Sequence, residues 1–153
     1  MKKQKLLIAV IGGHSCDRKT ARLAQRLGEE IAMLGAVLVC GGLGGIMEAA
    51  AKGAKKNGGL TVGILPGEDK KDANSFIDVP IATGLGYTRN TLVTTTADIV
   101  IALEGRYGTL SEIGFALNAK KPVIDLGSWD IEGVIKVQSV KKAIEIVKEI
   151  KQK

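Results

Sequence analysis

The sequence predicts an α/β protein with a doubly wound, mostly parallel sheet of about six to seven strands and helices on both faces. Short, continuous aliphatic runs alternate with segments of helical periodicity along the whole chain. Such runs are typical of strands that are buried on both faces of a parallel sheet. Several of the runs are followed at once by glycines, as expected where a strand turns into a helix. Strand and helix alternation of this kind indicates right-handed crossovers.

The strands are the clearest elements of the sequence. Runs such as LLIAVI and AVLVC contain no charged residue and end at glycine. Their length favours strands over buried helices. We expect strands at residues 6–11, 36–40, 60–65, 77–83, 97–103 and 121–127.

Helices are expected in the segments between these strands. An apolar residue recurs every three or four positions from Ala24 to Leu34, before Gly35 as a C-terminal cap. A second helix is expected through IMEAAAKGAKKN, a third begins at Thr109, and a basic one ends the chain. Residues 87–96 are ambiguous, because their β-branched side chains oppose a helix whereas their place between two strands favours one.

The size and charge of the chain limit its functions. Its 153 residues suit a single domain spanning 1–153, with one sizeable core. The net charge of +6 comes from lysines near the two termini, and the residues between them are almost neutral. Because a lysine-rich terminal helix is usually a solvated face, the sequence does not favour a nucleic-acid partner.

The cysteines and the N-terminal region indicate a cytoplasmic protein. Cys16 and Cys40 are isolated, with no zinc spacing and no disulfide framework, which suits a reducing compartment. His14 and Cys16 lack further ligands for a metal, so we expect no metal site. The apolar run from Leu6 to Ile11 is far shorter than a membrane span, and we expect no membrane association.

Three glycine-rich segments directly follow strands. Gly12-Gly13, Gly41–Gly45 and Gly105–Thr109 would all lie at the carboxyl edge of a parallel sheet, where ligands of such folds bind. Glycines let backbone N–H groups approach a phosphate, and a helix that starts there adds its positive dipole end. There is no GxGxxG and no GxxxxGK[ST], which disfavours a dinucleotide and a P-loop nucleotide site. We therefore expect a different phosphate-bearing small molecule.

Glu112 has two interpretations on spacing alone. Thr109-Leu110-Ser111-Glu112 fits a capping box, in which the threonine hydroxyl and the carboxylate bind free N–H groups of the first turn. The same position would also keep a carboxylate ionised beside a bound phosphate, where it could activate water or stabilise an oxocarbenium-like centre. The sequence leaves both open.

Two segments resemble the LONELY GUY (LOG) family, long labelled "lysine decarboxylase-like". They are CGGLGGIMEAAAKGA and RNTLVTTTADIVIALEGRYGTLSE, and the resemblance covers residues 6–126. It implies a Rossmann-like fold, assembly as a homodimer or homotetramer, and hydrolysis of the N-glycosidic bond of nucleoside 5′-monophosphates. The catalytic arginine and glutamate of the family fall on Arg89 and Glu112, and its phosphate-binding glycine and threonine on Gly108 and Thr109.

The chain departs from the LOG pattern at two places. Asn90 replaces the lysine of the Arg-Lys pair, and Glu104-Gly105-Arg106 replaces Pro-Gly-Gly. These features are closer to a sister branch that includes molybdenum-cofactor carrier proteins. Arg106 could clamp a phosphate or close the LOG pocket. No lysine has a convincing setting for pyridoxal phosphate, so a lysine decarboxylase is not expected.

The sequence thus predicts a protein that binds a nucleotide-type ligand and that could hydrolyse its glycosidic bond. The alternative is a carrier of molybdenum cofactor or a related phosphorylated ligand. No further cofactor is required. The predicted catalytic residues are Arg89 and Glu112, and the predicted ligand-binding residues are Gly12, Gly13, Gly42, Gly44, Gly105, Arg106, Gly108 and Thr109.

Overall fold

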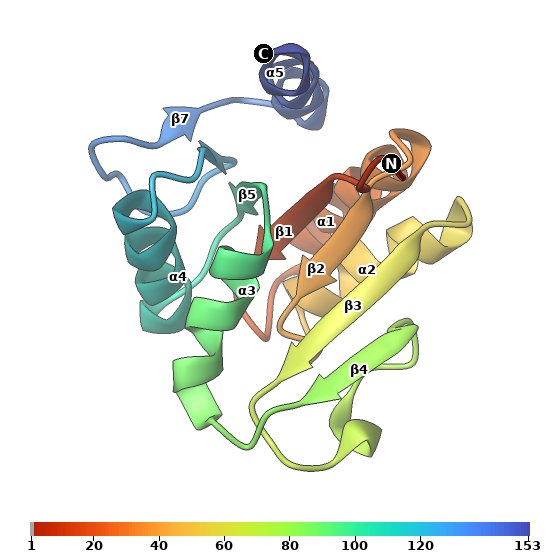
Figure 1. The fold of residues 1–153 in the computed structure, drawn as a ribbon. Coiled ribbons are helices and arrows are strands. Elements are labelled where there is room, and N and C mark those ends of the chain that lie inside the picture. Colours follow the sequence, from red (N-terminus) through yellow and green to blue (C-terminus); the bar gives the residue numbers. More distant parts are fainter. Residues whose placement is uncertain (1) are drawn as a thin grey trace.

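The computed structural model describes residues 2–153 and contains one seven-stranded sheet (Figure 1). The strands are β1 (Leu7–Ile11), β2 (Val37–Cys40), β3 (Leu60–Leu65), β4 (Val79–Ala82), β5 (Ile99–Ala102), β6 (Val123–Asp125) and β7 (Ile135–Lys136). Their spatial order is β4-β3-β2-β1-β5-β6-β7, and every neighbouring pair is parallel. The predicted α/β, Rossmann-like class with a parallel sheet is confirmed.

Helices cover both faces of the sheet. They are α1 (Arg18–Met33), α2 (Ile46–Lys56), α3 (Asn90–Thr96), α4 (Tyr107–Asn118) and α5 (Val140–Gln152), with short 3-10 helices η1 (Lys70–Asp72) and η2 (Gly86–Arg89). Side chains of α1, α2 and α5 share one core cluster, and those of α3 and α4 share the other. The result is a helix–sheet–helix arrangement in three layers (Figure 1).

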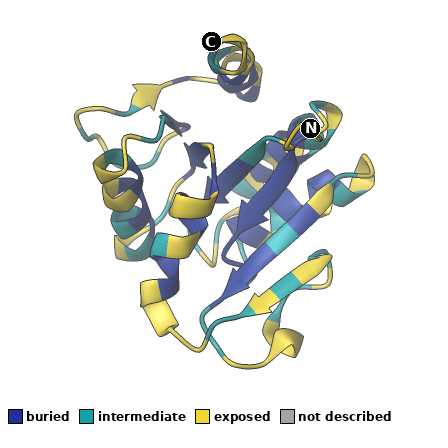
Figure 2. Cartoon of the chain, in the orientation of Figure 1, coloured by how far each residue is buried: buried dark blue, intermediate teal, exposed yellow. Residues whose placement is uncertain are grey.

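The aliphatic strands fill both cores at once. In β1, Ile8 and Val10 point into the core under α1, α2 and α5, whereas Ala9 and Ile11 point into the core under α3 and α4. This alternation follows from the two-residue period of a strand. It explains why the central strands read as unbroken apolar runs, and why Figure 2 shows β1 and β2 as wholly or almost wholly buried.

Two glycines let α1 and α2 meet closely. A Cβ atom placed on Gly28 would lie 1.9 Å from the carbonyl oxygen of Ala50, and one on Gly53 would lie 1.8 Å from that of Gln25. These distances are far below any real contact, so the two backbones touch where side chains would normally separate them. Glycine in a helix interior costs helix stability, and here it is required by the packing.

The structure settles one ambiguous segment and differs from the sequence prediction in two elements. Residues 87–96 form η2 and α3, because Val93 packs in the core and the Thr94 hydroxyl donates to the carbonyl oxygens of Asn90 and Thr91. Strand β7 was not predicted, since it is two residues long and exposed. Helix α4 begins at Tyr107, two positions before the predicted Thr109. None of the helices in residues 2–153 is long and apolar enough to cross a membrane.

Candidate functional site

The three predicted glycine loops meet at the carboxyl edge of the sheet. They follow β1, β2 and β5. In the sheet, β1 lies between β2 and β5, so the three loops are neighbours. The N–H group of Gly13 donates to the carbonyl oxygen of Glu104 (2.9 Å), and that of Ile46 donates to the carbonyl oxygen of Gly13 (3.0 Å). The loops therefore form one hydrogen-bonded unit at the point where strand order reverses, the usual ligand site of such sheets.

Several of these glycines are needed for packing between the loops. A Cβ atom on Gly105 would lie 2.0 Å from the Thr109 hydroxyl, and one on Gly12 would lie 2.6 Å from the Ile46 side chain. Gly45 has a positive φ of 63°, and its Cβ atom would lie 2.4 Å from the carbonyl oxygen of Gly13. Gly42 also has a positive φ, of 78°. At these positions the absence of a side chain is explained without any ligand.

Gly108 has room beside it for a side chain, whereas Gly44 lies close to the loop after β1. The nearest atom to a Cβ on Gly108 would be the Asn90 amide nitrogen, 3.8 Å away. A Cβ on Gly44 would lie 3.3 Å from the carbonyl oxygen of His14. Gly108 lies in the first turn of α4, where N–H groups have no acceptor within the helix. This turn is the part of the edge that a phosphate could approach.

Arg89 is buried, with 7% of its surface exposed, and its guanidinium binds protein acceptors. Nε donates to the carbonyl oxygen of Ile64 (2.8 Å) at the end of β3, and Nη2 donates to that of Gly41 (3.3 Å) after β2. Nη1 donates to the side-chain oxygen of Asn90. In this structure Arg89 joins three segments of the carboxyl edge. The predicted substrate contact would have to use its remaining N–H groups.

Asn90 extends the hydrogen bonds of Arg89 to α4. Its amide nitrogen lies 3.2 Å from the Ser111 hydroxyl and 3.5 Å from the carbonyl oxygen of Gly108. The Ser111 hydroxyl itself donates to that carbonyl oxygen (2.6 Å). Asn90 is buried and connects the guanidinium of Arg89 to the first turn of α4. The sequence marked Asn90 as a departure from the LOG pattern but gave it no role.

Glu112 lies inside the protein beside Arg89, with 7% of its surface exposed. Desolvation raises the pKa of its carboxyl from 4.5 to about 8, although the positive charge of Arg89 lowers it in part. Burial lowers the pKa of Arg89 for the same reason. Their charged atoms do not approach within 4.0 Å, since every ion pair among residues 2–153 joins other residues. Glu112 is therefore a mostly protonated acid at neutral pH.

The capping-box interpretation of Glu112 is wrong. The N-cap of α4 is Arg106, and no side chain caps the helix. Thr109 lies on the third position of the helix, and its buried side chain packs back onto the backbone of Gly105. Since the helix starts at Tyr107, Thr109 is its third residue and Glu112 its sixth, and neither caps it. The expectation that the helix dipole keeps Glu112 ionised also fails, because burial has the larger effect.

Arg106 and two aromatic residues border the open turn. Arg106 is exposed, and its carbonyl oxygen accepts a hydrogen bond from the Trp129 indole (3.2 Å). The Trp129 ring stacks on Tyr107, with centroids 6.0 Å apart and planes at 29°. The exposed guanidinium can reach a ligand, unlike that of Arg89. Whether it clamps a phosphate stays a prediction.

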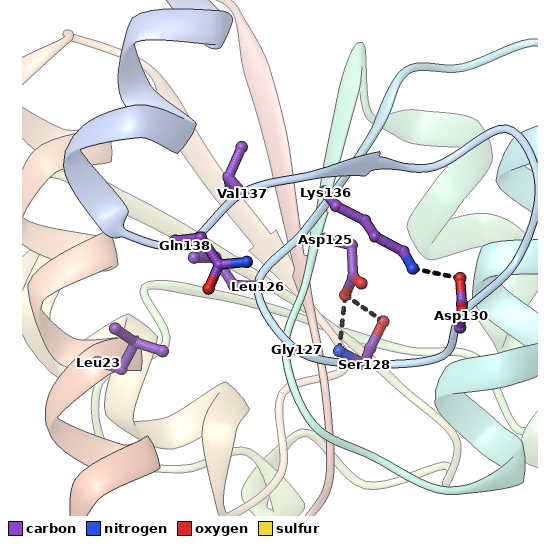
Figure 3. A pocket seen from close by; sticks show the side chains of 9 residues that line it. All are labelled: Leu23, Asp125, Leu126, Gly127, Ser128, Asp130, Lys136, Val137 and Gln138. Atoms are coloured by element: carbon purple, nitrogen blue, oxygen red, sulfur yellow. Dashed lines mark hydrogen bonds and ion pairs between the residues drawn. The ribbon is translucent and has the colours of Figure 1, made fainter.

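A cavity of about 330 Å³ lies at the same edge, beyond β6 and β7 (Figure 3). Asp125, the last residue of β6, has 5% of its surface exposed, and its Oδ1 accepts hydrogen bonds from the Ser128 N–H and hydroxyl, both 2.6 Å. Leu23, Leu126 and Val137 supply apolar walls. The sequence analysis missed this cavity. An acid at the end of an aliphatic strand, in VID, was the available signal.

The chain is similar over its whole length to proteins of one family. The sequence model of the SLOG cluster4 family matches residues 5–153. An uncharacterized protein from Archaeoglobus fulgidus is 52% identical over 120 residues, which is 78% of this chain and 78% of that protein.

Two solved structures named for the molybdenum cofactor share the fold. The molybdenum cofactor binding protein from the phototrophic bacterium Rippkaea orientalis superposes with a TM-score of 0.90 at 37% identity, covering 97% of this chain and 99% of that one. The molybdenum cofactor carrier protein of Chlamydomonas reinhardtii superposes with a TM-score of 0.90 at 34% identity, covering 98% and 100%. The expected LOG-like kinship is thereby confirmed.

Proposed function

Because the chain belongs to the SLOG cluster4 family, we propose that it binds molybdenum cofactor, or a related phosphorylated pterin, and holds it without turnover. The observation that carries this proposal is the similarity to the Rippkaea orientalis molybdenum cofactor binding protein over nearly all of both chains. The ligand would lie at the carboxyl edge of the sheet. In this arrangement the protein is a carrier, and it needs no further cofactor.

The phosphate would bind at the first turn of α4. Gly108 leaves room there for a ligand to approach the backbone, and Gly44, in the loop after β2, would support the neighbouring loop. The free N–H groups of the turn and the positive end of the helix dipole favour an anion. Arg106, exposed beside this turn, would add a charged donor. Gly12, Gly13, Gly42 and Gly105 would act indirectly, by holding the three loops in place.

The positions of Arg89 and Glu112 favour binding over hydrolysis. A hydrolase that uses a carboxylate to assist glycosidic cleavage needs that group ionised in at least one step. Burial keeps the pKa of Glu112 near 8, so the group is mostly protonated at neutral pH and is a poor general base or nucleophile. Three donors of Arg89 are already directed at protein oxygens, which leaves it poorly placed to orient a substrate.

A phosphoribohydrolase of the LOG type is the second candidate, and one observation favours it. A carboxyl with a pKa of about 8 can donate a proton near neutral pH. If Glu112 protonated the leaving base of a nucleoside 5′-monophosphate, the C1′–N bond would break, water would form a new bond to C1′ and give its proton to the Glu112 carboxylate, and ribose 5-phosphate would be released. Arg89 would stabilise that carboxylate while it is charged.

Two measurements on the purified protein separate these functions. An acid extract is oxidised and examined for pterin fluorescence, and the protein is incubated with AMP, GMP, CMP and UMP to look for free base and ribose 5-phosphate. The carrier predicts bound pterin and no released base. Base release by the wild type but not by Glu112→Gln would establish the hydrolase, with Glu48→Gln, an exposed acid in the first turn of α2, as the control. Neither pterin nor base would overturn both proposals.

We also propose that the chain forms a homodimer or homotetramer through its α3 and α4 side. Leu85, Tyr87 and Leu92, in and next to η2 and α3, are large apolar residues exposed to solvent, and so is Phe115 on α4. Apolar groups gathered on one face suit contact with a second copy. Light scattering of the wild type and of Leu92→Glu, expected to be smaller, tests this.

A further inference from the structure

We propose that the cavity beyond β6 binds the 2-aminopyrimidin-4-one edge shared by pterins and guanine, with Asp125 as the recognising group. This inference rests on the proposed function, because it names the part of the ligand that lies away from the phosphate. Nothing in the sequence pattern assigns this cavity, and Asp125 lies at the same edge of the sheet as the end of β5, which leads to the candidate phosphate site. It would make the protein selective for the heterocycle as well as for the phosphate.

Asp125 is a buried carboxylate without a cationic partner. No lysine, arginine or histidine among residues 2–153 lies within 4.0 Å of it, and the nearby Lys136 is paired with Asp130 instead (Figure 3). Buried carboxylates are costly unless donors or cations satisfy them. Ser128 satisfies Oδ1 twice, and both dashed bonds in Figure 3 reach that one oxygen. Oδ2 is left with room for donors from a ligand.

The volume and lining of the cavity suit a small, polar heterocycle. A volume of about 330 Å³ is in the range of small-molecule sites. Leu23, Leu126 and Val137 offer apolar contact to ring faces, and the Gln138 amide on the rim can donate to a ring carbonyl. A 2-aminopyrimidin-4-one places an amino N–H and a ring N–H side by side, a pair of donors that a carboxylate accepts. Adenine, with a ring acceptor beside its amino group, lacks this pair.

The loop that lines the cavity also contacts the segment that leads into α4. The loop that carries Ser128 continues to Trp129, whose indole donates to the carbonyl oxygen of Arg106 (3.2 Å). Asp125 lies in register with Ala102, the last residue of β5, and Gly105 follows three positions later. One ligand with its heterocycle at Asp125 and its phosphate at α4 would therefore lie along a single edge of the sheet.

The test compares the affinities of four phosphorylated probes by calorimetry, with free pterin measured beside them. Neopterin monophosphate and GMP carry the proposed edge, IMP lacks the amino group of GMP, and UMP has neither the purine nor the pterin ring. A hydrogen bond to a charged group contributes about 1.5–3 kcal/mol, which corresponds to roughly tenfold to a hundredfold in affinity. We expect the wild type to bind neopterin monophosphate and GMP more tightly than IMP by this factor. A preference for neopterin monophosphate or for GMP shows whether the cavity suits a pterin or a guanine better.

Asp125→Asn is the decisive variant. The asparagine keeps an oxygen for Ser128, so the turn is retained, but its amide can present a donor to a ligand edge that needs an acceptor. We expect it to abolish the preference for GMP over IMP. Asp72→Asn, an exposed acid in η1 that does not line the cavity, is the matched control and should change affinity by less than about twofold. Melting curves of both variants confirm the fold.

The outcomes separate this inference from the proposed function. Equal binding of all four probes, unchanged by Asp125→Asn, would leave a phosphate-binding protein and overturn the inference. Binding of free pterin that depends on Asp125, without any gain from a phosphate, would support the inference and overturn the proposed phosphate site. Binding of no probe and of no free pterin would overturn both.

Discussion

Gly105 and Gly108 lie three positions apart at the start of α4, yet they serve opposite purposes. A Cβ atom on Gly105 would lie 2.0 Å from the Thr109 hydroxyl, whereas one on Gly108 would meet nothing closer than 3.8 Å. The first glycine is required by the protein itself. The second leaves a surface open. A glycine-rich motif therefore marks a ligand site only where the space beside the glycine is empty.

The same contrast divides the whole carboxyl edge. We call Gly105, Arg89 and Glu112 the packed half, because each is fixed or enclosed by other parts of the protein. We call Gly108, Arg106 and the Asp125 cavity the open half. If this division is correct, substitutions in the packed half change stability, and those in the open half change ligand affinity.

Arg89→Ala should have the largest effect on stability. It removes three hydrogen bonds and leaves the buried carbonyl oxygens of Gly41 and Ile64 without their donor. Loss of such a network costs on the order of 3–5 kcal/mol. Urea unfolding of the variant measures this, and Arg106→Ala, expected within about 0.5 kcal/mol, is the control. Near-equal stability of the two variants would contradict the division.

Glu112→Gln should change how stability depends on pH. The pKa of Glu112 is about 8 in the folded protein and ordinarily 4.5, so between these values the unfolded chain releases a proton that the folded one keeps. Stability must then fall as pH rises from about 4.5 to 8, and level off above it, by on the order of a few kcal/mol. Melting temperatures at pH 5, 6.5 and 8 should diverge, with the variant gaining on the wild type. If the melting temperatures of the wild type and the variant changed in parallel with pH, the pKa of Glu112 would not be raised by burial.

Gly105→Ala should destabilise the protein by about 1–3 kcal/mol, the usual effect of overpacking. The added methyl would overlap both the hydroxyl and the Cβ atom of Thr109, so the helix start has to move. Chemical denaturation gives the difference. A companion Thr109→Ser, which removes the Thr109 methyl group, should recover little of the loss, because the Thr109 Cβ atom remains 2.6 Å away.

Gly108→Ala should have the smallest effect on stability, and of opposite sign. Alanine is favoured over glycine in helices by up to about 1 kcal/mol, and the new methyl would make only an ordinary contact, 3.8 Å from the Asn90 amide nitrogen. Ligand affinity, however, should fall if a phosphate approaches this turn. Thermal melting with and without neopterin monophosphate separates the two effects. Unchanged stabilisation by the ligand would move the phosphate away from Gly108.

The sequence predicted the fold better than the site. Aliphatic runs that pack on both faces are unmistakable, so the six longer strands were expected within about two residues of their observed ends. Strand β7 carries no such signal, because it is short and exposed. The start of α4 was misplaced since the pattern at Thr109 imitates a capping box, while the true start depends on contact between Gly105 and Thr109.

The site itself depends on contacts that spacing does not encode. Arg89, Glu112 and the three glycine loops were expected at one edge, and the structure brings them together. The sequence could not tell that the Arg89 donors are turned to protein oxygens, because the acceptors are carbonyl groups of Ile64 and Gly41, distant in the chain. Asp125 escaped notice because its cavity forms between α1, β6 and β7, elements that meet only in the fold.

The backbone contact between α1 and α2 has a further consequence for the edge. Each helix begins at one of the glycine loops, and Gly28 and Gly53 hold the two helices together without intervening side chains. Because this contact leaves no flexible side chains between the helices, we expect the loops after β1 and β2 to move together as one rigid unit. A ligand finds that side already shaped and loses little entropy in ordering it. Any adjustment to a different ligand would then come from the segments on the other side of the site, around Arg106 and Trp129.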